Sequence, residues 1–296
     1  MGHPALEGRG AVVTGAGRGI GAALARRLAA EGARVVVNDL DTAAAHAVAE
    51  EIGGRAAPGD CASEHGVAEL LAEAEQALGR VDLFMANAGL AALDPDDNGL
   101  EASEESWARL HEVNVMAHVR AARALVPQWL SETRRGEARP GAPGTGHPSE
   151  SAEGPGPRGR FVVTASAAGL LTMLGAAPYS VTKHAAVAFA EWLSASYGHR
   201  GVVVQAICPQ GVDTRIYEQA DELQPLLSHE GLLPPDAVAQ AWVDSLDDDR
   251  FLVLPHPRVA EHYRTRAGET DRWLAGMRHL QQRLEAARSS DVEENA

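Results

Sequence analysis

Short apolar runs alternate along the chain with longer segments whose apolar residues recur every three or four positions. The short runs are rich in valine and have the length of buried strands, whereas the longer segments have the period of helices. This alternation is typical of β-α-β units, which build a parallel sheet covered by helices on both faces. It predicts strands at 11–13, 35–38, 55–57, 83–85, 161–164, 202–207 and 251–254, and helices at 20–30, 42–52, 64–78, 105–133 and 179–199.

Two segments depart from this alternation. Residues 136–159 are dense in glycine and proline and have no apolar period, so we expect a mobile insertion without a packed core. A linker between domains would have the same composition, but the strand pattern resumes at Phe161, so we predict one domain over residues 1–296. The insertion leads into a strand, away from the edge that binds ligands, and is expected to be dispensable for catalysis. Apolar residues from about 257 to 288 predict a C-terminal helical extension packed on this domain.

Composition narrows the possible partners. The chain has 26 basic and 41 acidic residues, and its net charge of −15 disfavours binding to nucleic acid or an anionic membrane surface. No apolar run approaches the roughly 18 residues that span a bilayer, and no secretory signal is visible, so we expect a cytoplasmic protein. Cys61 and Cys208 form no CxxC pair, and His256 and His262 suit surface roles better than a zinc site, so we expect no metal.

A glycine-rich turn follows the first predicted strand and passes directly into a helical segment. Its sequence is Thr14-Gly15-Ala16-Gly17-Arg18-Gly19-Ile20-Gly21. A dinucleotide site needs glycine here, because the backbone must approach the pyrophosphate, whose charge then lies at the N–H groups of the helix. We therefore predict a dinucleotide site with Gly15, Gly19 and Gly21 as its main candidates, and a tight turn without a ligand is the alternative.

Polar and small residues also follow the later strands. Asp39 ends the second strand, where a carboxylate can accept hydrogen bonds from the adenosine ribose and repel a 2′-phosphate, which favours NAD over NADP. Arg18 could neutralise that phosphate, and a helix-capping role for Asp39 or Asp41 is the structural alternative. Further candidates at the carboxyl ends of strands, where open α/β sheets bind ligands, are Asp60-Cys61, Asn87-Ala88-Gly89 and Ser166.

Tyr179 and Lys183 are four residues apart in a helical segment, so their side chains share one face. Free tyrosine titrates near ~10, and a neighbouring ammonium lowers the pKa of the phenol toward the range useful for proton exchange. The pair therefore indicates general acid/base chemistry, although such pairs also occur on solvated helix faces.

Taken together, these motifs resemble those of the short-chain dehydrogenases/reductases. The order and spacing match from about residue 10 to residue 214 and include the glycine turn, Asp60, Asn87-Ala88-Gly89, Asn114, Ser166, Tyr179 and Lys183. The resemblance implies a single doubly wound Rossmann domain of class α/β with a seven-stranded parallel sheet. It also implies that Tyr179 is the general acid/base and that Ser166 orients the substrate oxygen. Lys183 would hold the nicotinamide ribose, and Asn114 would hold a water that relays protons to Lys183.

One motif departs from the family. Where the family usually has Pro-Gly-x-Val-x-Thr beside the nicotinamide, this chain has Pro209-Gln210-Gly211-Val212-Asp213-Thr214 with the glycine displaced, so the resemblance does not fix the backbone path at Gln210. With this motif, the candidate cofactor contacts are Gly15, Arg18, Gly19, Ile20, Gly21, Asp39, Asp60, Cys61, Asn87, Ala88, Gly89, Tyr179, Lys183, Pro209, Val212 and Thr214.

We predict an NAD(H)-dependent oxidoreductase that interconverts a secondary alcohol and a ketone. A non-catalytic protein that senses the dinucleotide is one alternative, but it would not need a Ser-Tyr-Lys set. Reduction of a ketone on an acyl carrier is another. The expected substrate cover at 213–235 has five carboxylates and one arginine among apolar residues, which disfavours that reaction and suits a neutral, apolar substrate. The apolar helix at 185–193 and the family resemblance predict a homodimer or homotetramer.

Overall fold

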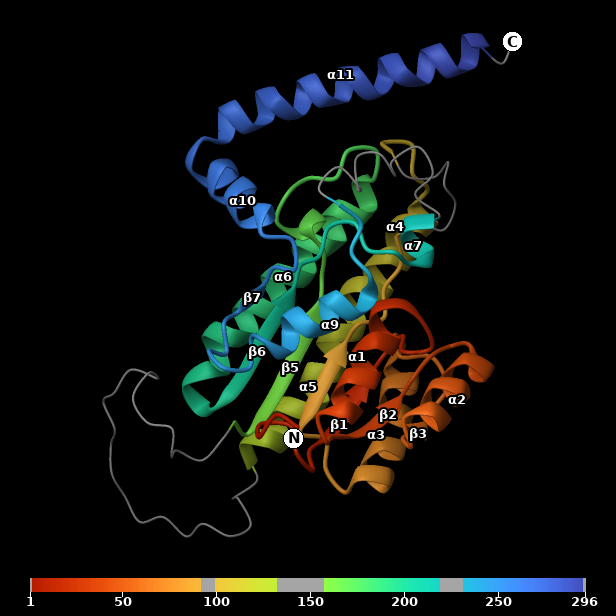
Figure 1. The fold of residues 1–296 in the computed structure, drawn as a ribbon, viewed down its shortest axis with the longest axis vertical. Coiled ribbons are helices and arrows are strands. Elements are labelled where there is room, and N and C mark those ends of the chain that lie inside the picture. Colours follow the sequence, from red (N-terminus) through yellow and green to blue (C-terminus); the bar gives the residue numbers. More distant parts are fainter. Residues whose placement is uncertain (1, 92–98, 132–156, 219–230, 295–296) are drawn as a thin grey trace.

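The computed structural model describes residues 2–91, 99–131, 157–218 and 231–294, and its centre is a seven-stranded sheet (Figure 1). The spatial order is β3-β2-β1-β4-β5-β6-β7, and every neighbouring pair is parallel. The expected sheet is confirmed, and no strand end differs from its expected position by more than two residues. The strands are β1 (Gly10–Val13), β2 (Arg34–Val37), β3 (Arg55–Ala56), β4 (Leu83–Ala86), β5 (Gly159–Thr164), β6 (Val202–Ile207) and β7 (Leu252–Val253).

Helices cover both faces of the sheet, as the alternating pattern predicts. One face packs against α1 (Gly19–Ala30), α2 (Thr42–Glu51) and α9 (Pro235–Val243). The other packs against α3 (Glu64–Leu78), α5 (Ala117–Ser131) and α6 (Ala177–Tyr197). The shorter helices α4 (Glu104–His111) and α7 (Arg215–Glu218) lie toward the carboxyl edge of the sheet (Figure 1).

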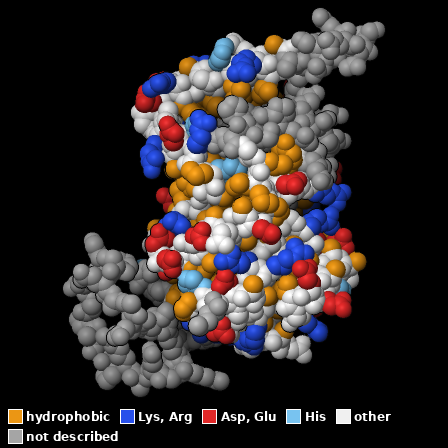
Figure 2. Space-filling view, in the orientation of Figure 1, with side chains coloured by type: hydrophobic (Ala, Val, Ile, Leu, Met, Phe, Trp, Pro, Cys, Tyr) orange, Lys and Arg blue, Asp and Glu red, His pale blue; other side chains and the backbone are white. Residues whose placement is uncertain are grey.

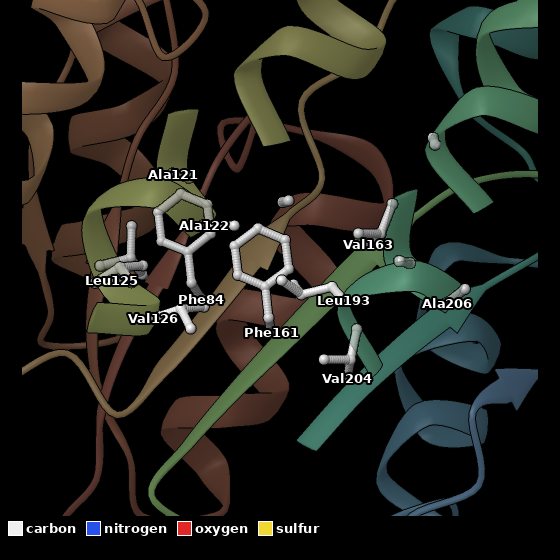
Figure 3. Packing of buried hydrophobic residues seen from close by; sticks show 14 of the residues in the cluster. Phe84, Ala121, Ala122, Leu125, Val126, Phe161, Val163, Leu193, Val204 and Ala206 are labelled. Carbon is white, nitrogen blue, oxygen red and sulfur yellow. The ribbon is translucent and has the colours of Figure 1, made fainter. Parts of the chain in front are cut away.

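Successive strand residues point to opposite faces, and because both faces are covered, nearly all of them are buried. Val13 and Val162 belong to the core beneath α1 and α9, whereas Val163 belongs to the core beneath α5 and α6. In that second core the rings of Phe84 and Phe161 stack with their centroids 5.5 Å apart, beside the apolar face of α5 (Figure 3). The sheet is therefore a rigid support whose carboxyl edge can hold a site in place.

The long helix expected at 105–133 is present, with one difference in its middle. A π-helical turn over Glu112–Met116 joins α4 to α5 without a break, and α5 is described as far as Ser131. A π turn inserts one extra residue into a helix and often marks a functional site. It leaves the apolar period almost unchanged, and for this reason the pattern did not predict it. Asn114 lies in this turn.

The C-terminal extension has two parts that differ in their contacts. α10 (Arg258–Gly268) packs on the domain, with Val259 fully buried. α11 (Thr270–Glu294) contacts α10 and then extends away from the sheet (Figure 1), and Leu274 is 44% exposed. The two helices of the extension thus differ, because α10 packs on the domain and α11 packs on α10, and an apolar period does not say which surface a helix meets.

The surface of the described residues carries charges of both signs. Acidic and basic side chains are interspersed over the described part of the face in Figure 2, which has no segregated basic patch. Among the described residues, no helix is long and apolar enough to cross a membrane. The predicted insertion lies outside the described residues except at its end, where the chain is described again from 157 and enters β5 at Gly159.

Candidate active site

The glycine turn and the segment after β4 meet at the carboxyl edge of the sheet. The chain builds β1, β2 and β3 to one side and then crosses to β4 on the other side of β1, and open α/β sheets bind ligands in the crevice at such a switch point. Thr14 Oγ1 accepts hydrogen bonds from the N–H groups of Asn87 and Ala88, both at 3.0 Å. Asn87 Nδ2 donates to the carbonyls of Thr14 at 2.9 Å and Gly15 at 3.2 Å. Asn87 therefore fixes the position of the glycine turn.

The turn has the backbone that a pyrophosphate site requires. Gly15 and Gly19 have φ of 61° and 54°, a region that favours glycine. A Cβ at Gly21 would lie 2.2 Å from the Gly15 carbonyl oxygen, so the helix could not approach the turn as closely with any other residue. Arg18 makes no side-chain cap at the start of α1, and the helix N-terminus favours an anion there. These residues fit a dinucleotide pyrophosphate.

Asp39 and Asp41 divide the two roles that the sequence left open. Asp39 Oδ2 accepts from the N–H of Gly17 at 2.9 Å, and its Oδ1 accepts from the N–H of Asp41 at 3.0 Å. Asp41 caps α2 by accepting from the N–H of Ala44 at 3.1 Å. Asp41 also pairs with Arg18, whose Nη2 lies 2.9 Å from Asp41 Oδ2. Asp39 is therefore not the helix cap. The N–H of Gly17 holds the Asp39 carboxylate against the glycine turn, and Gly17 is not among the predicted cofactor residues.

Asp60 and Cys61 lie beside the glycine turn as well. Asp60 accepts from the N–H groups of Ala62 at 2.8 Å and Ser63 at 3.1 Å. Burial disfavours ionised Asp60, but its hydrogen bonds outweigh burial and lower its pKa. The Cys61 thiol interacts with Thr14, and burial raises the pKa of this thiol to about 12, so it stays protonated at neutral pH. These two residues thus shape the crevice wall next to β1.

Ser166, Tyr179 and Lys183 come together on the other side of the crevice. Ser166 follows β5, Tyr179 lies in the first turn of α6, and the Ser166 hydroxyl lies near enough to the phenol to affect its pKa. Lys183 Nζ lies 5.7 Å from the centroid of the Tyr179 ring and donates to the carbonyl of Thr164 at 3.0 Å. A Cβ placed at Gly89 would lie 3.2 Å from Lys183 Nζ, so this group adjoins the loop after β4. The Ser-Tyr-Lys group therefore adjoins the loop after β4, whose Asn87 holds the glycine turn.

The electrostatics of this group are dominated by burial. Burial raises the pKa of the Tyr179 phenol, and the hydrogen bond with Ser166 offsets only part of that rise. Burial also lowers the pKa of Lys183 to about 8. Burial therefore sets the direction of the Tyr179 pKa, because the phenolate is costly to bury. A lowering of that pKa by the Lys183 ammonium stays a prediction.

Asn114 is a buried connector between two elements. Its Nδ2 donates to the carbonyl of Leu90 at 2.9 Å and to Thr182 Oγ1 at 3.1 Å, while its Oδ1 accepts from the N–H of Leu90 at 2.8 Å. The side chain therefore joins the loop after β4 to α6 and holds that loop next to Lys183. Thr182 was not predicted, and only its place beside Lys183 in the sequence could have suggested it. A water relay from Asn114 to Lys183 stays a prediction.

The loop after β6 closes the crevice. The carbonyl of Pro209 accepts from the N–H of Ala167 at 2.7 Å and lies 3.5 Å from Ser166 Oγ. Thr214 lies beside the glycine turn, since its Cγ2 would be 3.3 Å from a Cβ at Gly19. Val212 forms an isolated bridge with Leu233. The loop with Pro209 and Thr214 therefore lies beside both Ser166 and the glycine turn, and the contacts of Pro209, Val212 and Thr214 with the cofactor stay predictions.

His256 was missed as a residue of this region. It was expected at the surface, yet it is 3% exposed, and its Nδ1 accepts from the N–H of Gln210 at 3.1 Å. The expectation is wrong because β7 delivers His256 to the inside of the loop after β6. Within the described residues, no cluster of three histidine, cysteine or carboxylate side chains could hold a metal ion.

Apolar side chains surround the phenol of Tyr179. Leu110, Ala168 and Ala176 form a buried cluster with it, and Leu90 and Met173 pack against this cluster. The expected substrate cover at 213–235 lies partly outside the described residues, which omit 219–230. Apolar side chains of this cluster therefore pack beside Tyr179.

Comparison with known proteins places this arrangement in a family. The family model of the short chain dehydrogenases matches residues 9–138 and 153–224. The 1-deoxy-11-beta-hydroxypentalenate dehydrogenase of Streptomyces exfoliatus is 33% identical over 255 residues, which are 84% of this chain and 83% of that protein.

Two solved structures are similar over most of the chain. A short chain dehydrogenase/reductase from Burkholderia phymatum, in complex with NAD, is 26% identical, has a TM-score of 0.75 and matches over 91% of this chain and 96% of its own. The 3-ketoacyl-(acyl-carrier-protein) reductase of Brucella melitensis, complexed with NADH, is 26% identical with a TM-score of 0.67, over 84% of this chain and 96% of its own. The chain belongs to the short-chain dehydrogenase/reductase family and is an oxidoreductase that acts on CH–OH groups.

Proposed function

We propose that this protein interconverts a secondary alcohol and a ketone with NAD(H) as the cofactor. The observation that carries the proposal is that Ser166 lies beside Tyr179, with Lys183 one helical turn further along α6 and 5.7 Å from the centroid of the Tyr179 ring. This group faces the glycine turn across the crevice where open α/β sheets bind ligands. A group that exchanges a proton lies near a turn that suits a dinucleotide. This combination suits the transfer of a hydride together with a proton.

The residues divide the chemistry as follows. Bound nicotinamide supplies the acceptor or donor of the hydride. In alcohol oxidation, the phenolate of Tyr179 takes the hydroxyl proton as the C–H bond breaks, and in ketone reduction the phenol returns that proton to the carbonyl oxygen. The Ser166 hydroxyl holds the same substrate oxygen, and the Lys183 ammonium favours the phenolate during the reaction. The raised pKa of Tyr179 supports a phenol that is protonated before reduction.

The choice of NAD over NADP rests on charge near the adenosine ribose. The Asp39 carboxylate lies against the glycine turn, where it can accept from the ribose hydroxyls and repels a 2′-phosphate. Arg18, the cation that could neutralise such a phosphate, is paired with Asp41 at 2.9 Å. Both contacts favour NAD.

The substrate is a neutral, apolar alcohol or ketone. Leu110 and Ala176 pack beside the phenol, and Leu90 and Met173 border them, so a hydrocarbon frame around the carbinol carbon would find apolar contacts. The related dehydrogenase of Streptomyces exfoliatus is named for a hydroxylated substrate, which is consistent with an alcohol as the reacting group here.

The test combines a substrate panel with one substitution. NADH and NADPH formation or loss is measured against secondary alcohols, ketones and a 3-oxoacyl thioester. Tyr179→Phe should keep NADH binding but lower turnover by about 10²- to 10⁴-fold, the effect of a positioned acid/base group. Tyr197→Phe, at the far end of the same helix, is the matched control and should keep turnover.

Three outcomes would contradict the proposal. Wild-type turnover in Tyr179→Phe would remove the residue from the chemistry. NADH binding without hydride transfer to any member of the panel would instead indicate a dinucleotide sensor. Preference for the thioester over all free ketones would indicate an acyl-carrier reductase.

A further inference from the structure

A single peptide unit links the Ser-Tyr-Lys group to the C-terminal part of the chain. The carbonyl of Pro209 and the N–H of Gln210 belong to the same peptide plane. The carbonyl accepts from Ala167 N–H at 2.7 Å and lies 3.5 Å from Ser166 Oγ, while the N–H donates to His256 Nδ1 at 3.1 Å. In a trans peptide these two groups point in opposite directions, so the plane is held from both sides.

We propose that His256 is a positioning residue, which fixes the Pro209–Gln210 peptide and through it the Ser166 hydroxyl and the loop beside the nicotinamide. The inference rests on the proposed function of that site. With its outer bond removed, the peptide could rotate about its flanking bonds, and the carbonyl that meets Ser166 would turn with it. This contact lies where the chain departs from the family's Pro-Gly-x-Val-x-Thr pattern, at Gln210.

His256 is well placed to act as a fixed anchor. It is 3% exposed, follows β7 by three residues, and its carbonyl accepts from the N–H of Val259 at 3.1 Å in the first turn of α10. Val259 is fully buried in the core. A ring held by a strand on one side and a packed helix on the other loses little conformational entropy when it binds the loop.

α10 contacts the second loop of the site as well. Arg266 Nη1 donates to the carbonyl of Leu170 at 2.7 Å, directly after the 3₁₀ turn that begins beyond Ser166. One helix therefore braces both loops that frame the Ser166 hydroxyl, at His256 on its N-terminal side and at Arg266 near its end. The role of α10 is thus to hold the site, whereas α11 continues away from it.

The acceptor atom defines the matched variants. Because Nδ1 accepts, the neutral ring carries its proton on Nε2. His256→Asn can place an amide oxygen close to the position of Nδ1. His256→Gln places its amide oxygen one bond further out, closer to the position of Nε2, and His256→Ala provides no acceptor. Comparison of these variants separates the loss of the hydrogen-bond acceptor at Nδ1 from the loss of side-chain volume.

The experiment uses the full-length protein and three measurements. Hydrogen exchange of residues 205–215 without ligand measures how well the loop after β6 is ordered. Dissociation constants for NADH and ADP-ribose compare binding with and without the nicotinamide, and kcat measures turnover. His256→Ala should speed exchange, lower kcat by about tenfold and weaken NADH more than ADP-ribose, which lacks the nicotinamide. His256→Asn should restore at least half of the wild-type kcat, and His256→Gln should resemble His256→Ala.

Folded His256→Ala with wild-type exchange and wild-type kcat would overturn the proposal. If the alanine variant does not fold, equal exchange and equal kcat for His256→Asn and His256→Gln would overturn it, and faster exchange with lower kcat in His256→Gln alone would support it. Should the wild type transfer no hydride, the proposed function fails, and the exchange and binding measurements still decide the role of His256.

Discussion

Lys183 is expected to reduce the stability of the fold while it serves the reaction. The side chain is 4% exposed, and burial lowers the pKa of its ammonium from 10.5 to about 8. A group with a lower pKa in the folded state is destabilising below that pKa, and the penalty fades as pH rises toward the unfolded value. At 1.36 kcal/mol per pH unit, the shift corresponds to about 3 kcal/mol at neutral pH.

Lys183→Met removes this penalty, because methionine has a similar length and no charge. The substitution also removes the hydrogen bond to the carbonyl of Thr164, made at 3.0 Å, which costs about 1 kcal/mol. We therefore expect the variant to unfold at pH 7 with a free energy about 2 kcal/mol higher than wild type, and to lose its catalytic activity. Between pH 7 and pH 9.5 this difference should shrink by about 2 kcal/mol as the wild-type ammonium is deprotonated.

The measurement is urea-induced unfolding at both pH values and equal protein concentration, since an oligomer would make the midpoints concentration-dependent. Tyr179→Phe is the control, because it keeps the buried ammonium and should keep the wild-type change between the two pH values. A Lys183→Met variant no more stable than wild type at pH 7 would refute the reasoning. So would a difference that stays constant between pH 7 and pH 9.5.

Three further predictions concern separate parts of the molecule. Asp39→Ala should lower the ratio of kcat/KM for NAD to that for NADP at least about tenfold, because it removes a charge that repels the 2′-phosphate. An unchanged ratio in steady-state assays would show that Asp39 does not set the cofactor preference. His118 is 2% exposed, and burial lowers its pKa to about 3, so protonation of the unfolded chain destabilises the fold as pH falls below about 6.5. His118→Leu should gain about 2–3 kcal/mol over wild type at pH 4.5 in thermal unfolding, and equal acid sensitivity would contradict this. Val181 and Trp192 are 55% and 57% exposed on one face of α6, so a second copy is expected to cover them, and Trp192→Glu should shift light scattering from oligomer to monomer. A monomeric wild type at micromolar concentration would end this interpretation.

Much of the fold could be read from the chain because its signals are local. A strand buried on both faces is a short apolar run, and a helix packed by one face has a period of 3.6, so neither depends on distant residues. The ends of β6 coincide with the expectation, and α6 begins two residues before the expected 179. The glycine turn and the pair Tyr179 and Lys183 were also readable, since each lies within one element or one turn.

Other features depend on residues that are far apart in the sequence. The sequence did not show which carboxylate caps α2. The hydrogen bonds show that Asp41 caps the helix and that Asp39 binds the glycine turn. The π turn at Asn114 was hidden because one inserted residue hardly changes an apolar period. The direction of the Tyr179 pKa shift depends on burial, which no spacing reports.

By itself, the sequence determined the α/β class, the seven strands and the residues at the carboxyl edge, because periodicity and turn chemistry act over a few residues. The tertiary structure alone decided that Ser166 lies beside Tyr179, that His256 reaches Gln210 from 46 positions away, and that α11 leaves the domain. These contacts arise where separate elements pack together, and their geometry is set by the sheet order and by burial, which a linear pattern does not contain.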